Sequence, residues 1–130
     1  MSNEIFLYER NLRKNADFNL WFFYPAQESF AMSSLGYLWL FREIDMLDDI
    51  NIERVYSDSK TTKIMRSNID IVGISFSFDM DFLEILQFLK NNNYPFKASE
   101  RNNCEPLIFA GGPVITANPE PYSEILDFMI

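Results

Sequence analysis

Short apolar runs alternate along the chain with longer segments in which apolar residues recur at helical spacing. The runs predict strands at residues 19–24, 50–56, 69–78 and 106–112, with a further strand beginning at Asp127–Ile130. The longer segments predict helices at residues 33–47, 79–93 and 119–128, the first of them capped by Ser33 or Ser34. Because strands that alternate with helices need crossover connections, the pattern predicts an α/β domain built on a parallel sheet.

Composition and charge then exclude several classes of function. Apolar residues make up 48% of the chain and charged residues 23%, which is ordinary for a globular domain. The net charge of −8 and the lack of a basic stripe argue against a nucleic-acid partner. No apolar run approaches the ~18 residues of a membrane span, and the first residues show no signal-peptide pattern, so we expect a cytoplasmic protein with no membrane partner.

The scarcity of histidine and cysteine limits the chemistry further. The chain has no histidine and one cysteine, Cys104, which lies in a polar segment and is interpreted as a bystander. A structural zinc site or a cysteine-ligated cluster cannot be built from this set, and a serine or cysteine nucleophile would lack its usual base. An independent hydrolase is therefore disfavoured, and no catalytic or metal-binding residue is assigned.

The candidate binding residues follow the predicted strands. Ligands of open parallel sheets bind beyond the carboxyl ends of the strands, and three such tips are rich in small, uncharged residues. Glycine permits close approach to the backbone, and serine offers a neutral hydroxyl, so the tips suit a large, neutral cofactor rather than a metal or polyphosphate. The candidates are Ser33, Ser34, Gly36, Ser75, Ser77, Gly111, Gly112 and Pro113. Helix capping, room for a packed helix and a tight turn are the structural alternatives at the three tips.

Four quoted segments carry a resemblance to a known family. "FYPAQESFAMSSLGYLWLF", "ERVYSD", "DIVGISFSFDMDFLEILQFLKNNNYPFKASER" and "PLIFAGGPVITANPEPYSEILDFMI" together resemble the amino-terminal cobalamin-binding-like domain of radical S-adenosylmethionine proteins. The resemblance implies a three-layer, Rossmann-like (flavodoxin-like) parallel sheet with helices on both faces. It divides the chain into an N-terminal extension, 1–17, and an α/β domain, 18–130, which is expected to be truncated at its fifth strand.

The resemblance also implies cofactors and partners. In the family, a barrel that binds S-adenosylmethionine and a four-iron cluster follows this domain, and this chain lacks the cysteine triplet of that barrel. Ser75 and Ser77 resemble the serine motif of cobalamin-binding domains, and Gly111 and Gly112 resemble their glycine pair. The first loop, "SFAMSSLG", keeps Gly36 but lacks the cobalt-ligating histidine, which puts cobalt ligation in doubt.

Two main hypotheses therefore stay open for the function. The chain is either a cobalamin-binding module of a radical enzyme, not catalytic alone, or a degenerate, cofactor-free scaffold that shapes the substrate side or mediates assembly. Its expected partner is the radical barrel, and an incomplete sheet edge would also favour self-association. A flavin-binding, flavodoxin-like module is a more distant alternative, and a response-regulator receiver is disfavoured because the first strand lacks an acidic pair at its tip.

Overall fold

The computed structural model describes residues 12, 13 and 15–130, so most of the predicted N-terminal extension lies outside the described residues. The strands are β1 (Phe18–Tyr24), β2 (Ile50–Tyr56), β3 (Ile71–Ser75), β4 (Leu107–Gly111) and β5 (Phe128–Met129). The α-helices are α1 (Glu28–Ala31), α2 (Leu35–Asp45), α3 (Asp81–Asn91) and α4 (Pro113–Ala117). Short 3₁₀ turns lie at Arg66–Asn68, Ala98–Glu100 and Glu120–Tyr122.

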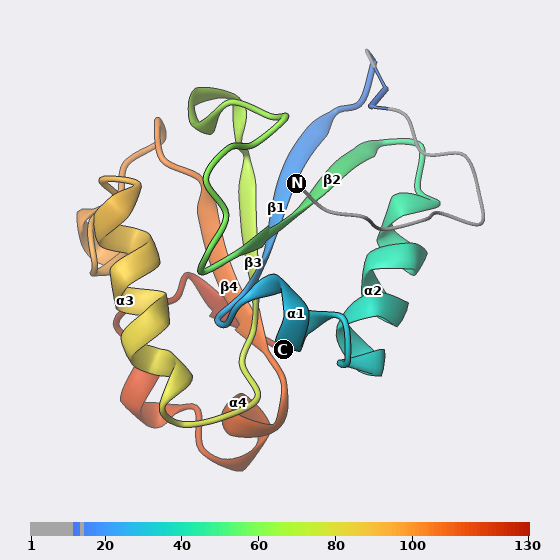
Figure 1. Cartoon of the computed structure of the whole chain (residues 1–130). Helices are drawn as coiled ribbons and strands as arrows, with labels where there is room; N and C mark the ends of the chain where they lie inside the picture. The colour runs from blue at the N-terminus through green and yellow to red at the C-terminus, as the bar shows by residue number, and fades with distance from the viewer. Residues whose placement is uncertain (1–11, 14) are drawn as a thin grey trace.

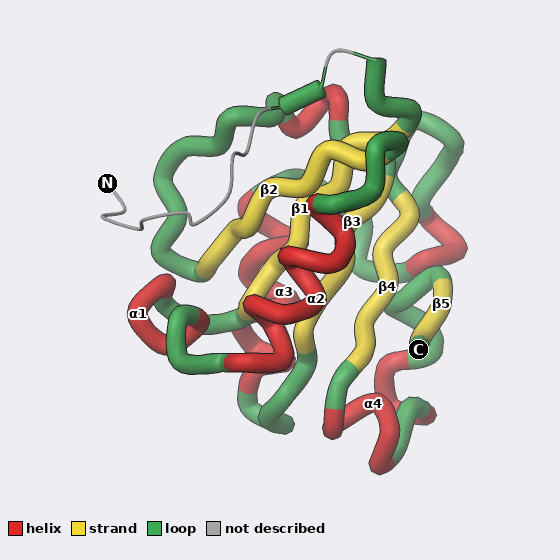
Figure 2. The backbone as a smooth tube through the Cα atoms, turned by 90° about the vertical axis from the view of Figure 1, so that its right-hand side faces the viewer, coloured by secondary structure: helices red, strands yellow, loops and turns green. Residues whose placement is uncertain are grey.

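The five strands form one parallel sheet in the order β2-β1-β3-β4-β5 (Figures 1 and 2). Helix α2 connects β1 to β2 on one face, and α3 connects β3 to β4 on the other face (Figure 1). The predicted three-layer, flavodoxin-like α/β fold is therefore confirmed. The chain reverses its direction of travel across the sheet between β1 and β3, and such a switch point is where open α/β sheets place their ligands.

Each face of the sheet has its own hydrophobic cluster. The cluster on the α2 side gathers around the ring of Tyr37, which stacks on Phe22 at 4.4 Å and donates a hydrogen bond from its hydroxyl to the Phe22 carbonyl at 2.6 Å. The cluster on the α3 side is larger and includes the stacked rings of Phe23 and Phe88, 4.2 Å apart. Side chains of successive strand residues point to opposite faces, so β1 contributes to both clusters.

The segment after β4 corrects one prediction. The helix predicted at residues 119–128 is wrong, because the chain makes α4 at Pro113–Ala117 and then only a 3₁₀ turn at Glu120–Tyr122. The helical spacing of Tyr122, Ile125 and Leu126 reflects packing on the core without an α-helix. The short helix α1 lies in a segment for which no helix was predicted.

Side-chain hydrogen bonds stabilise both ends of helix α2. Ser34 is the N-cap of α2, where its hydroxyl oxygen accepts from the Tyr37 N–H at 3.4 Å, which confirms one of the two predicted caps. At the other end of the helix, the Arg13 guanidinium donates to the carbonyls of Asp45 at 2.8 Å and Ile50 at 3.1 Å. A cation at a helix C-terminus is favoured by the helix dipole, so Arg13 fastens the start of the domain to α2 and β2.

No helix among the described residues is long and apolar enough to cross a membrane.

Candidate functional site

The structure places the predicted site residues along the carboxyl edge of the sheet, which is the lower edge in Figure 1. Ser75 ends β3 and is paired with Gly111, which ends β4. The two strand tips are joined further by a hydrogen bond from the Phe76 N–H to the Gly111 carbonyl at 2.8 Å. Gly112 and Pro113 then open α4.

The first loop contributes three candidates at the start of α2. The Ser33 hydroxyl donates to the Phe30 carbonyl at 2.7 Å, and the Ser34 hydroxyl caps α2. Both hydroxyls therefore have a local structural role. Gly36 is different, because a Cβ built on it would meet no atom within 4 Å, so its surroundings are open.

Ser75 and Ser77 are half-buried, and within the described part of the chain neither hydroxyl makes a hydrogen bond. Asp81 lies near this tip and accepts a hydrogen bond from the Phe78 N–H at 3.2 Å. Burial raises the pKa of Asp81 above its ordinary value, against the opposing effect of the backbone hydrogen bonds from Phe78 and Ser77. The β3 tip thus offers two hydroxyls without hydrogen bonds among the described residues, near a half-buried carboxyl group.

Gly112 is required by the backbone itself. Its φ of 122° lies in a region that residues with a side chain rarely adopt, and a Cβ there would lie 2.6 Å from the carbonyl oxygen of Phe76. The same carbonyl accepts the Val114 N–H at 3.3 Å, at the start of α4. The glycine therefore lets the β4 tip turn tightly against the β3 tip.

A Cβ added to Gly111 or to Gly73 would point to the α2 face of the sheet, where side chains of this protein already occupy the space. A Cβ on Gly111 would lie 3.0 Å from Cγ1 of Ile130. A Cβ on Gly73 would lie 2.8 Å from Cζ of Phe109, whose ring covers the glycine and stacks on Phe128 at 4.8 Å with an interplanar angle of 8°. Sequence reasoning missed Gly73, although a glycine inside a strand signals a close approach of another group.

These contacts test whether the glycines form a cradle for a cofactor tail. The space beside Gly73 and Gly111 is taken by Phe109 and Ile130, and the space beside Gly112 is taken by a backbone carbonyl. The residues present therefore do not leave an open cradle over the glycine tip. No group of three or more His, Cys, Asp or Glu side chains that could hold a metal ion occurs among the described residues.

Among the described residues, helix covers only the β1-β2 half of the α2 face. Strand register puts Leu107, Phe109 and Phe128 on the same face as the β1 residues that pack under α2. Leu107 is 52% exposed and Phe128 is 43% exposed, and Ile130 beside them is exposed as well. The β3-β4-β5 half of this face, which we call the open apolar face, consists of Ile71, Leu107, Phe109, Phe128 and Ile130.

Comparison with known proteins gives one family. The family model described as "Radical SAM proteins, N-terminal" matches residues 36–130, which is well over half of the chain. The matched region runs from the start of α2 to β5, and so it contains most of the sheet and all of the candidate residues except Ser33 and Ser34. A search of curated proteins gives no match.

Proposed function

The chain belongs to the family of N-terminal regions of radical S-adenosylmethionine proteins, and from this premise we propose that it serves as a cofactor-free scaffold module of such an enzyme. The module is not catalytic alone. Its proposed role is to pack against the catalytic barrel of the enzyme and shape the substrate side of that barrel.

The observation that carries this proposal is the filled space on the α2 face. Phe109 and Ile130 occupy the space beside Gly73 and Gly111, so a cofactor tail could not approach the backbone there without moving them. The ring of Phe109 also belongs to the open apolar face. Leu107 and Phe128 are exposed on neighbouring strands of this face, so they form a patch rather than isolated apolar residues. Contiguous exposed apolar patches mark interaction surfaces, and the partner that the family supplies is the barrel.

Cobalamin binding is the second candidate, and two observations favour it. The Ser75 and Ser77 hydroxyls are uncommitted within the described residues, and the space around Gly36 is open. Both features lie at the carboxyl edge, near the switch point of the sheet. If cobalamin bound there, these groups would hold it with neutral hydrogen bonds, and no imidazole of this chain would reach the cobalt.

A titration with hydroxocobalamin separates the two candidates. The folded chain is mixed with hydroxocobalamin and dialysed, and retained cobalamin is read from the absorption spectrum. The scaffold proposal expects none to be retained by the parent chain. Retention by the parent chain would overturn the proposal and support the cobalamin candidate.

Two variants give the titration a matched comparison. Phe109→Ala removes the ring that covers Gly73, whereas Phe96→Ala removes an exposed ring elsewhere. Retention by the Phe109→Ala chain alone would identify the ring as the group that closes the site.

The partner is tested by binding of the separately prepared barrel of the enzyme to the chain. Leu107→Lys places a charge in the open apolar face, and Leu83→Lys places one on an exposed leucine of α3. The proposal expects the first substitution to weaken binding and the second to leave it unchanged. Equal effects of the two substitutions would contradict the assigned surface.

A further inference from the structure

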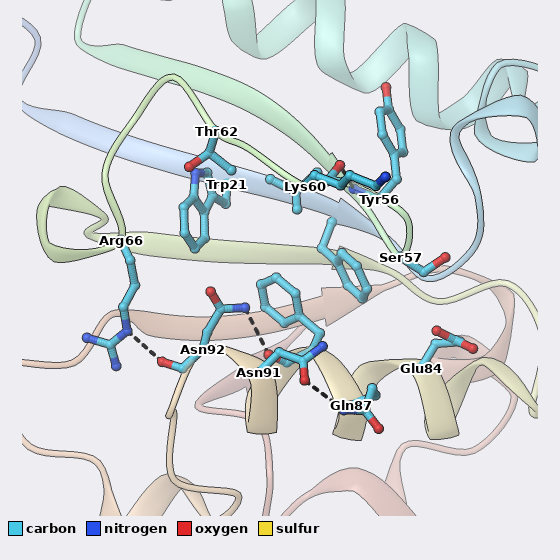
Figure 3. Close-up of a pocket in the computed structure, with 14 residues that line it drawn as sticks. Trp21, Tyr56, Ser57, Lys60, Thr62, Arg66, Glu84, Gln87, Asn91 and Asn92 are labelled. Carbon is cyan, nitrogen blue, oxygen red and sulfur yellow. Dashed lines mark hydrogen bonds between the residues drawn. The ribbon is translucent and has the colours of Figure 1, made fainter. Parts of the chain in front are cut away.

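A second site lies on the α3 face of the sheet, between α3 and the connection from β2 to β3. The connection from β2 to β3, residues 57–70, contains only the 3₁₀ turn Arg66–Asn68. Between this connection, the strands and α3 lies a cavity of about 270 Å³ (Figure 3). It is separate from the glycine tip and from the open apolar face, and none of the residues predicted from the sequence lines it.

The floor of the cavity is aromatic and belongs to the core. Trp21 and Phe23 of β1 and Phe88 of α3 line it, and Trp21 is only 2% exposed. Phe23 and Phe88 stack at 4.2 Å, and Trp21 meets Phe88 edge to face at 6.3 Å. Little of these rings reaches the cavity, because Phe23 is 1% exposed and Phe88 is 6% exposed, so the floor offers a small aromatic area that favours a small apolar ligand group.

One buried carboxylate holds the wall of the cavity in place. Glu53 of β2 is buried and accepts three hydrogen bonds, from the backbone N–H groups of Lys63 at 2.6 Å and Ile64 at 2.9 Å and from Nε1 of Trp21 at 3.3 Å. These bonds tie the connection to the same tryptophan that forms the floor. The cavity is therefore built into the fold rather than left by a loose loop.

The rim carries neutral polar groups, and one lysine and one glutamate, both exposed, line it from different elements. Gln87 and Asn91 of α3 are hydrogen-bonded to each other at 2.7 Å. Arg66 also lines the cavity, but its guanidinium forms a salt bridge with Glu105 at 3.1 Å. Lys60 of the connection and Glu84 of α3 also line the cavity, and neither forms an ion pair within the described residues.

We propose that this cavity binds a small aromatic zwitterion, such as an aromatic amino acid. The aromatic floor takes the ring, Lys60 attracts the carboxylate, and Glu84 attracts the ammonium group. The volume lies just below the range of about 300–1,000 Å³ that is typical of drug-sized ligands, which limits the occupant to a small molecule. A ligand with a single charge would leave either Lys60 or Glu84 without a partner.

The test uses Trp21 as its reporter. In a Trp39→Phe background the exposed tryptophan of α2 is removed, and the fluorescence of Trp21 on the cavity floor is followed during titration. The probes are phenylalanine, phenethylamine, which lacks the carboxylate, and 3-phenylpropionate, which lacks the ammonium group. We expect a saturable change with phenylalanine and about two- to fivefold weaker binding of each single-charge probe, as for solvent-exposed ion pairs.

Charge variants assign each preference to its residue. Lys60→Ala should abolish the advantage of phenylalanine over phenethylamine, whereas Lys63→Ala, a lysine of the same connection that does not line the cavity, should preserve it. Glu84→Gln should abolish the advantage over 3-phenylpropionate, and Glu43→Gln on α2 should not.

Three results would overturn the inference. They are no saturable change with any probe, equal affinity for all three probes, or the same effect from Lys60→Ala as from Lys63→Ala. Far-ultraviolet circular dichroism of each variant shows that it remains folded. Cobalamin retention has no bearing on this outcome, because the cavity shares no residue with the glycine tip.

Discussion

Replacing Gly112 by alanine should destabilise the chain even when no ligand is present. The φ of 122° is strained for alanine, which costs about 1–3 kcal/mol. The new Cβ would also lie 2.6 Å from the Phe76 carbonyl oxygen, and overpacking of this kind costs about 1–3 kcal/mol more. The neighbouring backbone will relax in part, so we expect a total loss of about 2–4 kcal/mol in the free energy of unfolding.

Two other glycines provide a graded comparison. Gly111→Ala has no positive φ, but its Cβ would lie 3.0 Å from Cγ1 and 3.1 Å from the backbone oxygen of Ile130, so a loss of about 1 kcal/mol is expected. Gly36→Ala lies within α2 with open space around it, and it should stabilise the chain by about 0.5–1 kcal/mol. The expected order of stability is therefore Gly36→Ala, parent, Gly111→Ala, Gly112→Ala.

Urea unfolding followed by circular dichroism measures this order. With a slope of about 2 kcal/mol per molar urea, the Gly112→Ala midpoint should fall by roughly 1–2 M. Parent-like stability of all three variants would refute the argument. It would mean that the glycine tip is not held by its own backbone contacts and that close approach of a ligand is the better explanation.

Three further changes test other parts of the structure. Glu53→Gln turns one carboxylate oxygen into an amide group that faces a backbone donor such as the Lys63 N–H, so we expect a loss of about 1–3 kcal/mol in urea unfolding and faster proteolysis within residues 57–70. Tyr94→Phe removes a hydroxyl that is buried without a hydrogen-bond partner among the described residues, and should leave stability unchanged or raise it by about 1 kcal/mol. Burial raises the pKa of Tyr94 to about 12, above its ordinary 10.0, so the parent should lose stability as the pH rises from 10 to 12, and thermal unfolding of the phenylalanine variant should lack that loss. Burial also raises the pKa of Asp81 above its ordinary 3.8, so folding favours the protonated carboxyl group. The stability that this group contributes is therefore present below pH 3.8 and is lost as the pH rises through the folded-state pKa. Asp81→Asn should flatten this part of the stability profile, and an unchanged profile would contradict the assignment.

The strands and the two long helices could be predicted from local patterns because burial imposes a period on the sequence. The predicted strand at residues 50–56 coincides with β2, and the strand at 19–24 differs from β1 by one residue. The apolar stripe of α3 was also visible, since Ile85 and Leu89 are buried. In α2 the apolar residues at helical spacing are not all buried, because Leu40 is exposed while Tyr37 and Phe41 are buried.

Short elements were not predictable in the same way. Helix α4 contains the β-branched run Val114-Ile115-Thr116, which has low helix propensity, and it forms because Val114 and Ile115 pack into the core. Proline at its first position starts it without the loss of a hydrogen bond. At residues 119–128 the opposite happened, since helical spacing was present but only a 3₁₀ turn formed.

In the candidate site, too, local features could be predicted from the sequence and long-range contacts could not. The sequence placed Ser75 and Gly111 at strand tips, and the register shows them side by side. It could not show that Phe109 covers Gly73, because the two residues are far apart in the chain and meet only through the pairing of β3 with β4. The cavity beside α3 was invisible for the same reason, since its floor and walls come from three separate segments.

The sequence by itself determined that the chain alternates strands with helices, that the sheet is parallel, and that glycines and serines follow the strands. These properties are local, because each depends on the period of burial or on the residues next to a turn. Only the tertiary structure decided the strand order β2-β1-β3-β4-β5, the open apolar face, the filled space over the glycines and the cavity beside α3. Each of these arises from contacts between distant segments, and hydrophobic burial, which has no directional preference, leaves no record of such partners in the local pattern.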